Sequence, residues 1–382
     1  MCRGCVAHPC MQACPKGAIS MKDGKSYIDQ EKCIKCGKCK AACPYDAISH
    51  NVRPCEQACG VKAIGSDEQG RASILEDKCV SCGMCMVSCP FGAISDKSQI
   101  FQLSHALRDG DKIIAIVAPA YISQFGDDVT PGKFKTALQV LGFSDVHEVA
   151  FGADVGAISE AHHYAKEVAT GNLPFLLTSC CPSWSMMAKK FFPTMIDNIS
   201  QELTPMVATA RKVKQDQPDA KVVFIGPCAS KKLEAMRRTV RSDVDFVLTF
   251  EELDAMFDAR EIDPASFEED GSLHDATAAG RGYAVAGGVA GAIEACLKEY
   301  YPDVPVHIEH AESLAECKKV LALAKAGKLN GCMIEGMACP GGCMGGAGTN
   351  VPVAKSSKEL KKFLASCSKK LPPKGLVDIE LN

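Results

Sequence analysis

TSCCPSW at residues 178–184, GPCASKK at 226–232 and MACPGGC at 337–343 each place cysteine beside proline or glycine, residues that favour turns. The three stretches lie far apart in a chain of 382 residues. A metal cluster bound by several segments needs this pattern, because the fold must gather thiolates that are remote in sequence. We therefore expect the three stretches to meet at one metal site.

Composition narrows the class of protein. The formal charge is −3, so nothing suggests a nucleic-acid partner. No apolar run approaches the roughly 18–20 residues that span a bilayer, so we expect no membrane partner. The N-terminus shows no apolar signal region, which favours a cytoplasmic location. With 23 cysteines, an odd number, a secreted disulfide framework is also disfavoured.

Four related units occupy the first hundred residues, which hold 14 of the cysteines. The motif CxxCxxCxxxCP is intact in two units, one unit has a wider gap, and one retains only two cysteines. Each unit ends in an Ala-Ile pair. The units span residues 2–19, 33–48, 55–64 and 79–94.

This motif is typical of [4Fe-4S] clusters. Its first three cysteines bind one cluster, and the cysteine before proline binds the other cluster in two-cluster ferredoxins. Zinc is the alternative, but zinc sites use two CxxC pairs or cysteine with histidine. The repeats therefore predict an α+β ferredoxin-like domain over residues 1–97 with three [4Fe-4S] clusters.

The ligands of each cluster follow if the fourth cysteine of each repeat binds the cluster of the paired repeat. The first cluster would take Cys2, Cys5, Cys10 and Cys43. The second would take Cys33, Cys36, Cys39 and Cys14. The third would take Cys79, Cys82 and Cys85 with a fourth ligand that the sequence leaves open. Either Cys59 completes it, leaving Cys55 and Cys89 as remnants of a lost cluster, or Cys89 does.

The residue pattern changes near Lys112, where apolar runs separated by amphipathic segments replace the cysteine repeats. Apolar runs predict buried strands at Ile113–Val117, Phe175–Leu177, Val222–Ile225, Val306–Ile308 and Cys332–Ile334. Helical segments are predicted between them at Gly156–Ala169, Ser185–Phe192, Gly291–Tyr300 and Ser313–Ala326. Alternation of strands and helices predicts an α/β catalytic domain with mostly parallel sheets over residues 98–382.

The cysteines of the three stretches differ in what they can bind. Cys180 and Cys181 are neighbours at the end of a predicted strand, where successive side chains point to opposite sides. One of them is therefore a ligand, and the other is free for different chemistry. Cys228 also follows a strand, and Cys339 and Cys343 flank a Pro-Gly-Gly loop that suits a bulky group. Buried structural cysteine would explain any one of these alone.

These motifs resemble the catalytic domain of [FeFe]-hydrogenases, whose patterns are TSCCPxW, PCxxKxxE and ExMACxxGCxxGG, in the same order. The resemblance includes FGAD at Phe151–Asp154 and the ferredoxin repeats, and covers nearly the whole chain. It implies an H-cluster, in which a [4Fe-4S] cubane shares a thiolate with a two-iron unit carrying CO, cyanide and azadithiolate. The ligands implied are Cys181, Cys228, Cys339 and Cys343, with Cys343 as the bridge.

The resemblance implies roles for five further residues. Cys180 would be the thiol that carries protons, Glu160 the next carboxylate, and Ser200 the hydroxyl between them. Lys231 would hydrogen-bond a cyanide, and Met337 would pack over the dithiolate.

Some positions depart from the family pattern. His163 stands where the family has an outer glutamate, one turn beyond Glu160, and histidine would make the proton route sensitive to pH. Gly226 replaces a frequent methionine and Ala120 a frequent serine. Residues 204–206 read Thr-Pro-Met in place of Ser-Pro-Gln. These changes predict altered surroundings for the two-iron unit.

The resemblance implies reversible conversion of H₂ to protons and electrons. Electrons would pass along the N-terminal clusters to a soluble carrier, a ferredoxin, and maturases would build the two-iron unit. Two alternatives stay open: an H₂-sensing regulatory hydrogenase with slow turnover, and an iron–sulfur electron-transfer or assembly protein without the two-iron unit. Cys180 argues against the first, and Lys231 and Met337 argue against the second.

Overall fold

The computed structural model describes residues 2–49, 52–241, 243–269, 273 and 276–381. It divides into two compact units, Met1–Gln57 and Ala58–Asn382. Residues 58–97, the second pair of repeats, group with the long second unit. The boundary after residue 97 stays a prediction that separates cluster-binding repeats from the rest of the chain. The two compact units divide elsewhere, after Gln57, inside the repeat that has only two cysteines.

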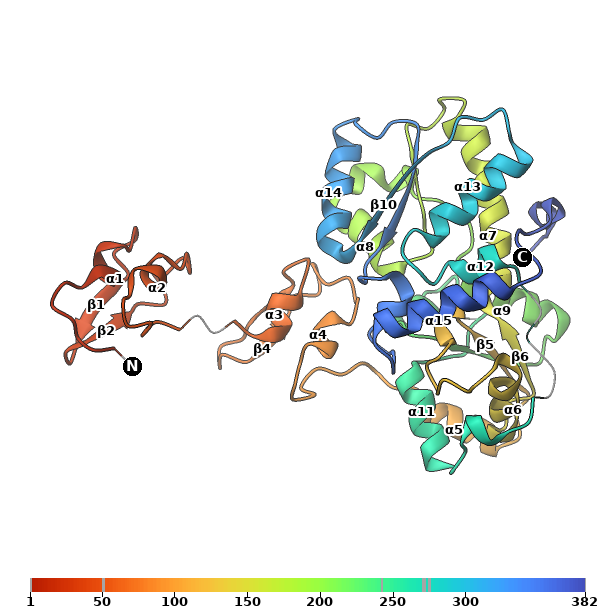
Figure 1. Cartoon of the computed structure of the whole chain (residues 1–382), viewed down its shortest axis with the longest axis horizontal. Coiled ribbons are helices and arrows are strands. Elements are labelled where there is room, and N and C mark those ends of the chain that lie inside the picture. Colours follow the sequence, from red (N-terminus) through yellow and green to blue (C-terminus); the bar gives the residue numbers. More distant parts are fainter. Residues whose placement is uncertain (1, 50–51, 242, 270–272, 274–275, 382) are drawn as a thin grey trace. The chain divides into compact units, whose positions relative to one another are not determined.

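The first unit is a hairpin with short helices (Figure 1). Strands β1 (Ile19–Lys22) and β2 (Lys25–Ile28) pair antiparallel. The turn between them is Asp23–Gly24, both at positive φ, as a two-residue hairpin turn requires. Helices α1 (Pro9–Gln12) and α2 (Lys38–Ala42) carry parts of the cysteine motifs. Helix α3 (Pro54–Ala58) follows at the end of the unit.

The repeats have the same backbone conformation, as their sequences predict. The second pair forms strands β3 (Ile64–Ser66) and β4 (Ala72–Ile74), paired antiparallel, and helix α4 (Met84–Val87). In all four repeats, the third residue after the last cysteine has a positive φ. These residues are Gly17, Asp46, Lys62 and Gly92, with φ of 58°, 44°, 53° and 59°. The half-unit therefore retains the local fold of the intact units.

A four-stranded parallel sheet, in the order β6-β5-β8-β9, forms one half of the larger unit. Its central strands, β5 (Ile113–Val117) and β8 (Lys221–Ile225), were predicted from their apolar runs. The edge strands β6 (Asp145–Glu148) and β9 (Phe246–Leu248) were not. Edge strands have one neighbour, so a short or partly polar segment can form them.

A three-stranded parallel sheet, in the order β10-β11-β7, forms the other half. Its strands are β10 (His307–Glu312), β11 (Cys332–Met337) and β7 (Leu176–Leu177). Alternate residues of β11 face different cores: Ile334 packs with α8 (Pro182–Phe191) and α14 (Ser313–Lys325). Met333 packs with α7 (Val149–His163) and α13 (Gly288–Tyr300). Helices thus cover both faces, which confirms the predicted α/β class (Figure 1).

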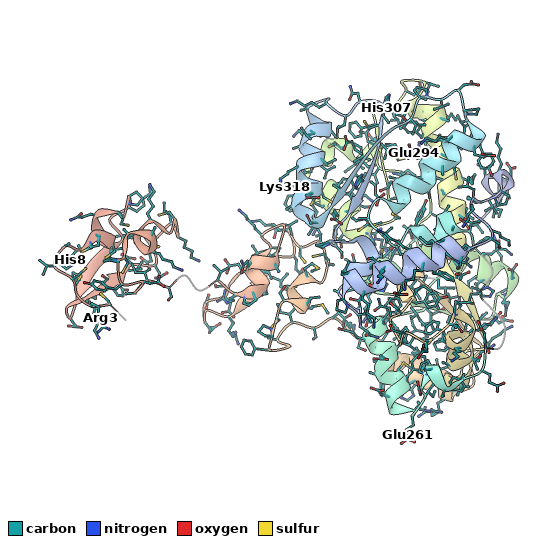
Figure 2. The ribbon with its side chains drawn as sticks, viewed as in Figure 1. Arg3, His8, Glu261, Glu294, His307 and Lys318 are labelled. Carbon is teal, nitrogen blue, oxygen red and sulfur yellow. The ribbon has the colours of Figure 1, made fainter. Side chains whose placement is uncertain are left out.

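Figure 2 shows charged side chains on the outer surfaces of these helices, including Lys318 on α14 and Glu294 on α13. The predicted helices are present, but α7 begins at Val149 instead of Gly156 and continues as a π-helical turn, Tyr164–Val168. The other helices of this unit complete its surface. They are α5 (Ile100–Arg108), α6 (Pro131–Leu141), α9 (Pro205–Asp216), α10 (Ser230–Ala235), α11 (Phe250–Ala259), α12 (Ala278–Gly282) and α15 (Val353–Ser366).

The strands direct their carboxyl ends toward the cysteine stretches. Thr178 follows β7, Gly226 follows β8, and Ala338 follows β11. In α/β proteins, binding sites form at the carboxyl ends of parallel strands. Within the described residues, no helix is both long and apolar enough to cross a bilayer.

Candidate functional site

A buried cavity brings the three cysteine stretches together. Five cysteines line it, and they come from three remote segments. They are Cys180, Cys181, Cys228, Cys339 and Cys343. Met337 and Lys231 line the same cavity, and Lys231 is the one charged side chain among its described lining residues. The convergence expected from the sequence is therefore present.

Close backbone packing holds the three stretches in place. A Cβ on Gly336 would lie 2.1 Å from the ring of Trp184, so β11 touches the first stretch directly. A Cβ on Gly346 would lie 2.4 Å from the carbonyl oxygen of Pro227, which joins the third stretch to the second. Gly341 and Gly342 have φ of 79° and 71°, so the loop between Cys339 and Cys343 uses backbone that favours glycine.

The cavity suits a polynuclear metal group. Burial raises the pKa of Cys228 to about 11 and that of Cys343 to about 12, and neighbouring cysteines add to both shifts. Thiolates here therefore require a cation, because a metal deprotonates a coordinating thiol outright. No group of three or more potential ligands among the described side chains is close enough for one metal ion. The described lining offers five thiols and no histidine or carboxylate, a donor set that suits an iron–sulfur cluster.

A buried ion pair extends from the second stretch. Lys231, 9% exposed, donates to Glu234 at 2.7 Å and to the carbonyl oxygen of Cys180 at 3.3 Å. Burial alone would lower the pKa of Lys231, but the Glu234 carboxylate leaves it above its ordinary value. Thr204 donates its hydroxyl to Glu234 at 2.7 Å. The threonine at this departure from the family pattern thus anchors the ion pair.

Among the predicted proton carriers, Glu160 interacts with both Ser200 and Cys180. Glu160 is 5% exposed, and burial raises its pKa to about 8. The Ser200 hydroxyl and the Ser179 backbone N–H hydrogen-bond to Glu160 and oppose that shift. Cys180 faces Glu160, and burial holds the pKa of its thiol well above the usual range. When Glu160 is ionised, its carboxylate can accept a proton from the Cys180 thiol, and a pKa of about 8 makes both of its forms accessible near neutrality.

His163 is placed differently. It lies at the C-terminal end of α7, partly exposed, and no hydrogen bond or ion pair within the described residues joins its side chain to Glu160 or Ser200. Glu202, which sequence reasoning missed, is a closer partner: its charge raises the pKa of Glu160, and its backbone N–H donates to Ser200 Oγ at 3.3 Å. No sequence pattern marks Glu202, because it lies in an irregular loop.

Three further cavities collect the N-terminal cysteines. The first is lined by Cys2, Cys5, Cys10 and Cys43. The second is lined by Cys14, Cys33, Cys36 and Cys39. The third is lined by Cys59, Cys79, Cys82 and Cys85. Cys55 and Cys89 line none of the three.

Backbone donors surround these sulfurs as they would surround cluster thiolates. The first cysteine of each complete unit accepts an N–H from two residues onward, and the last cysteine from four onward. Examples are Lys35 to Cys33 at 3.4 Å and Ala63 to Cys59 at 3.1 Å. Hydrogen bonds to sulfur favour the thiolate and tune the potential of a cluster. The residues present therefore fit [4Fe-4S] clusters.

The third cavity packs directly against the catalytic part. Lys190 on α8 donates to the carbonyl oxygens of Glu76 and Cys79 at 2.6 and 2.7 Å. Lys232 on α10 lines the cavity and pairs with Asp96 at 2.7 Å and Glu252 at 2.8 Å. Neighbouring residues of α10, Lys231 and Lys232, thus serve two different cysteine cavities.

Comparison with known proteins identifies the catalytic part. The family described as "Iron only hydrogenase large subunit, C-terminal domain" matches residues 111–347. The chain belongs to the iron-only hydrogenase family. A "4Fe-4S binding domain" matches residues 26–49 and an "LdpA Fe-S cluster-binding domain" matches residues 49–100, so these repeats are also similar to known cluster-binding domains of other proteins.

Two relatives show the extent of the similarity. The chain is 32% identical to the periplasmic [Fe] hydrogenase large subunit of Nitratidesulfovibrio vulgaris, over 85% of this chain and 86% of that protein. It is 31% identical to iron hydrogenase 1 of Clostridium pasteurianum, over 87% of this chain and 67% of that protein. The solved structure of a variant of the [FeFe]-hydrogenase HydA1 from Chlamydomonas reinhardtii shares the fold, with a TM-score of 0.58, 21% identity, and coverage of 72% of this chain and 91% of that chain.

The cavity lining includes two of the positions that depart from the family pattern. Ala120 and Met206 line it at the positions where a serine and a glutamine are frequent, so two polar groups are replaced by apolar ones. Tyr283 also lines the cavity, and sequence reasoning missed it, because it lies in the turn between α12 and α13 and belongs to no motif. Its hydroxyl is buried without a hydrogen-bond partner among the described residues.

Proposed function

We propose that this protein catalyses the reversible conversion of H₂ into protons and electrons at a six-iron H-cluster. The observation that carries the proposal is the single cavity where five cysteines from three remote segments meet. Four of them suffice for a cubane, and the fifth supplies a free thiol. The family membership of residues 111–347 supports the same chemistry.

Cys181, Cys228, Cys339 and Cys343 would hold the cofactor, with Cys343 shared between its two parts. When bound, the H-cluster supplies the cleavage and formation of the H–H bond. Lys231 would offer its remaining N–H to a cyanide, since Glu234 and the carbonyl oxygen of Cys180 already accept from this ammonium. Met337 and the apolar lining would exclude water from the two-iron unit.

The residues of the chain would move protons through buried neutral groups. A proton on Cys180 Sγ would pass to Glu160, which the Ser200 hydroxyl and the Ser179 N–H orient. Because burial raises the pKa of Glu160 to about 8, this carboxyl can both accept and release a proton near neutrality. Beyond Glu160, Glu202 or His163 would connect the route to solvent.

Electrons would pass through three [4Fe-4S] clusters. Their ligands would be the cysteines of the three N-terminal cavities, with Cys59 completing the third cluster and Cys55 and Cys89 left as remnants. Cys82 supports this route, because it packs against the same hydrophobic cluster as Cys181 of the five-cysteine cavity. The external partner would be a ferredoxin-type carrier in the cytoplasm, and maturases would supply the two-iron unit.

One experiment tests the whole proposal. Protein expressed without maturases should lack H₂ activity, and addition of a synthetic two-iron complex should restore it. Infrared bands of CO and cyanide should appear at the same time. Full activity in unmatured protein, or loading without such bands, would reject the H-cluster. Slow turnover that is insensitive to Cys180→Ala would instead favour the sensory alternative.

A further inference from the structure

The Tyr283 side chain carries a polar group that the fold leaves unpaired. It is 6% exposed, and its Oη has no hydrogen-bond partner among the described residues. Buried hydroxyls in folded proteins are nearly always paired, so an unpaired one calls for a specific explanation. The ring packs in the core around α7 and α13, which fixes its position.

The phenol reaches the helix that carries Glu160. A Cβ built on Gly156 would lie 3.8 Å from Tyr283 Oη. Gly156 is one turn before Glu160 on α7, so both positions share a face of the helix. The absence of a side chain at Gly156 leaves room for the hydroxyl beside the proton route.

Besides burial, the charges of four titratable groups raise the pKa of this phenol: Glu160, Cys180, Cys296 and Asp154. Asp154 is already satisfied, because its oxygens accept from Thr277 N at 2.7 Å, Thr277 Oγ1 at 2.5 Å and Gly280 N at 2.9 Å.

Cys296 is fully buried in the hydrophobic core, and a thiol is a weak acceptor. Glu160 and Cys180 are therefore the groups that can use the donor.

Glu160 needs additional donors when it is ionised. Glu202 and Glu335 are the charged groups near it, and both raise its pKa. Glu335 is itself satisfied by the N–H groups of Gly287 at 2.9 Å and Ala290 at 2.7 Å. A carboxylate has about four acceptor sites, and only Ser200 and Ser179 donate to Glu160 within the described part of the chain.

We propose that Tyr283 is a positioning residue of the proton route, whose hydroxyl donates a hydrogen bond through one water molecule to the carboxylate of Glu160. The role in proton transfer rests on the proposed function, whereas the hydrogen bond does not. When a proton passes, the S–H bond of Cys180 breaks and an O–H bond forms on Glu160. The O–H bond of Tyr283 stays intact and stabilises the charged form of the acceptor.

The test is an infrared titration of the Glu160 carboxyl in full-length protein without the two-iron unit, with Glu160→Gln identifying its band. Tyr283→Phe keeps the ring and removes the donor, so the pKa of Glu160 should rise by about one unit. Tyr121→Phe is the matched control. Its hydroxyl is also buried and has no hydrogen-bond partner in the described part of the chain, but the charges that act on it most are those of Glu148 and Arg281, so the pKa of Glu160 should not change.

A second variant protects the test against misfolding. Gly156→Val retains Tyr283 and pushes its hydroxyl away from α7, and should raise the pKa of Glu160 in the same direction. An unchanged or lowered pKa in both variants overturns the proposal. In loaded enzyme, CO and cyanide bands that shift in Tyr283→Phe while Glu160 titrates as in wild type would place the donor on the two-iron unit and also overturn it. Failure to produce H₂ would reject the proposed function without changing the titration result.

Discussion

Lys231 on α10 donates a hydrogen bond to the backbone carbonyl of Cys180, 3.3 Å away. The contact joins the second cysteine stretch to the first, and the same ammonium holds Glu234, which is 1% exposed. The geometry of the free thiol therefore depends on a buried ion pair.

Removing the lysine should leave Glu234 as an unpaired buried charge. Lys231→Met should lower the free energy of unfolding by about 3–5 kcal/mol, as expected for a broken buried pair. Denaturant unfolding of protein without the two-iron unit would measure this loss. The double variant Lys231→Met with Glu234→Gln should recover much of it, because no charge remains buried. A double variant no more stable than the single variant would contradict this view of the pair.

Glu160 should make stability fall as pH rises. Its pKa is raised to about 8 in the folded protein, above the ordinary value of 4.5, so between these values the folded state binds more protons than the unfolded state. The stabilisation is fully present below about pH 4.5 and is lost as pH rises through 8. Relative to Glu160→Gln, wild-type protein should lose about 1.4 kcal/mol per pH unit in this range. Parallel stability curves for the two proteins would show that Glu160 is not perturbed.

The exit of the proton route can be assigned with two substitutions. His163→Glu should shift the acidic or neutral limb of the pH–rate profile if His163 carries protons, and an unchanged profile would remove His163 from the route. Glu202→Gln removes a charge that raises the pKa of Glu160, so it should lower that pKa and move the profile toward acid. Measured side by side, the two profiles identify the outer group.

Contact between β11 and the first cysteine stretch should tolerate no extra atom. Gly336→Ala would place its Cβ 2.1 Å from the Trp184 ring and should cost about 1–3 kcal/mol of unfolding free energy through forced repacking. Gly291→Ala is the matched control, because nothing lies within 4 Å of a Cβ there and the residue is inside α13. This control should be neutral or stabilising by up to about 1 kcal/mol. Equal stability of the two variants would refute the close contact.

Iron content should separate the two assignments of the third cluster. Protein without the two-iron unit should hold about sixteen irons, four for each of four cubanes. Cys59→Ala should remove about four, whereas Cys89→Ala should remove none. The opposite result would make Cys89 the ligand. Loss of iron in neither variant would mean that both cysteines lie outside the cluster.

The sequence predicted those features that are marked by a pattern of neighbouring residues. Apolar runs located the central strands β5 and β8, and the cysteine motifs located the five-cysteine cavity. The edge strand β6 was missed because its residues, Asp-Val-His-Glu, are mostly polar. The start of α7 was missed because the helix is buried on nearly all sides, so it has no amphipathic period.

The neighbours of Glu160 depend on tertiary contacts alone. Tyr283 and Glu202 belong to no motif, and they approach Glu160 only because α7 packs beside other segments in the fold. For His163, the sequence spacing and the folded structure differ. Its position on the helix is one turn from Glu160, but within the described residues its side chain makes no hydrogen bond or ion pair with Glu160 or Ser200.

Helix α10 has a mechanical consequence. It is six residues long, and its adjacent lysines contact different segments: Lys231 donates to the carbonyl oxygen of Cys180, and Lys232 pairs with Asp96 and Glu252. So short a helix cannot bend between its ends. A shift of this helix would therefore move Lys231 and Lys232 together, and with them part of the lining of both cysteine cavities.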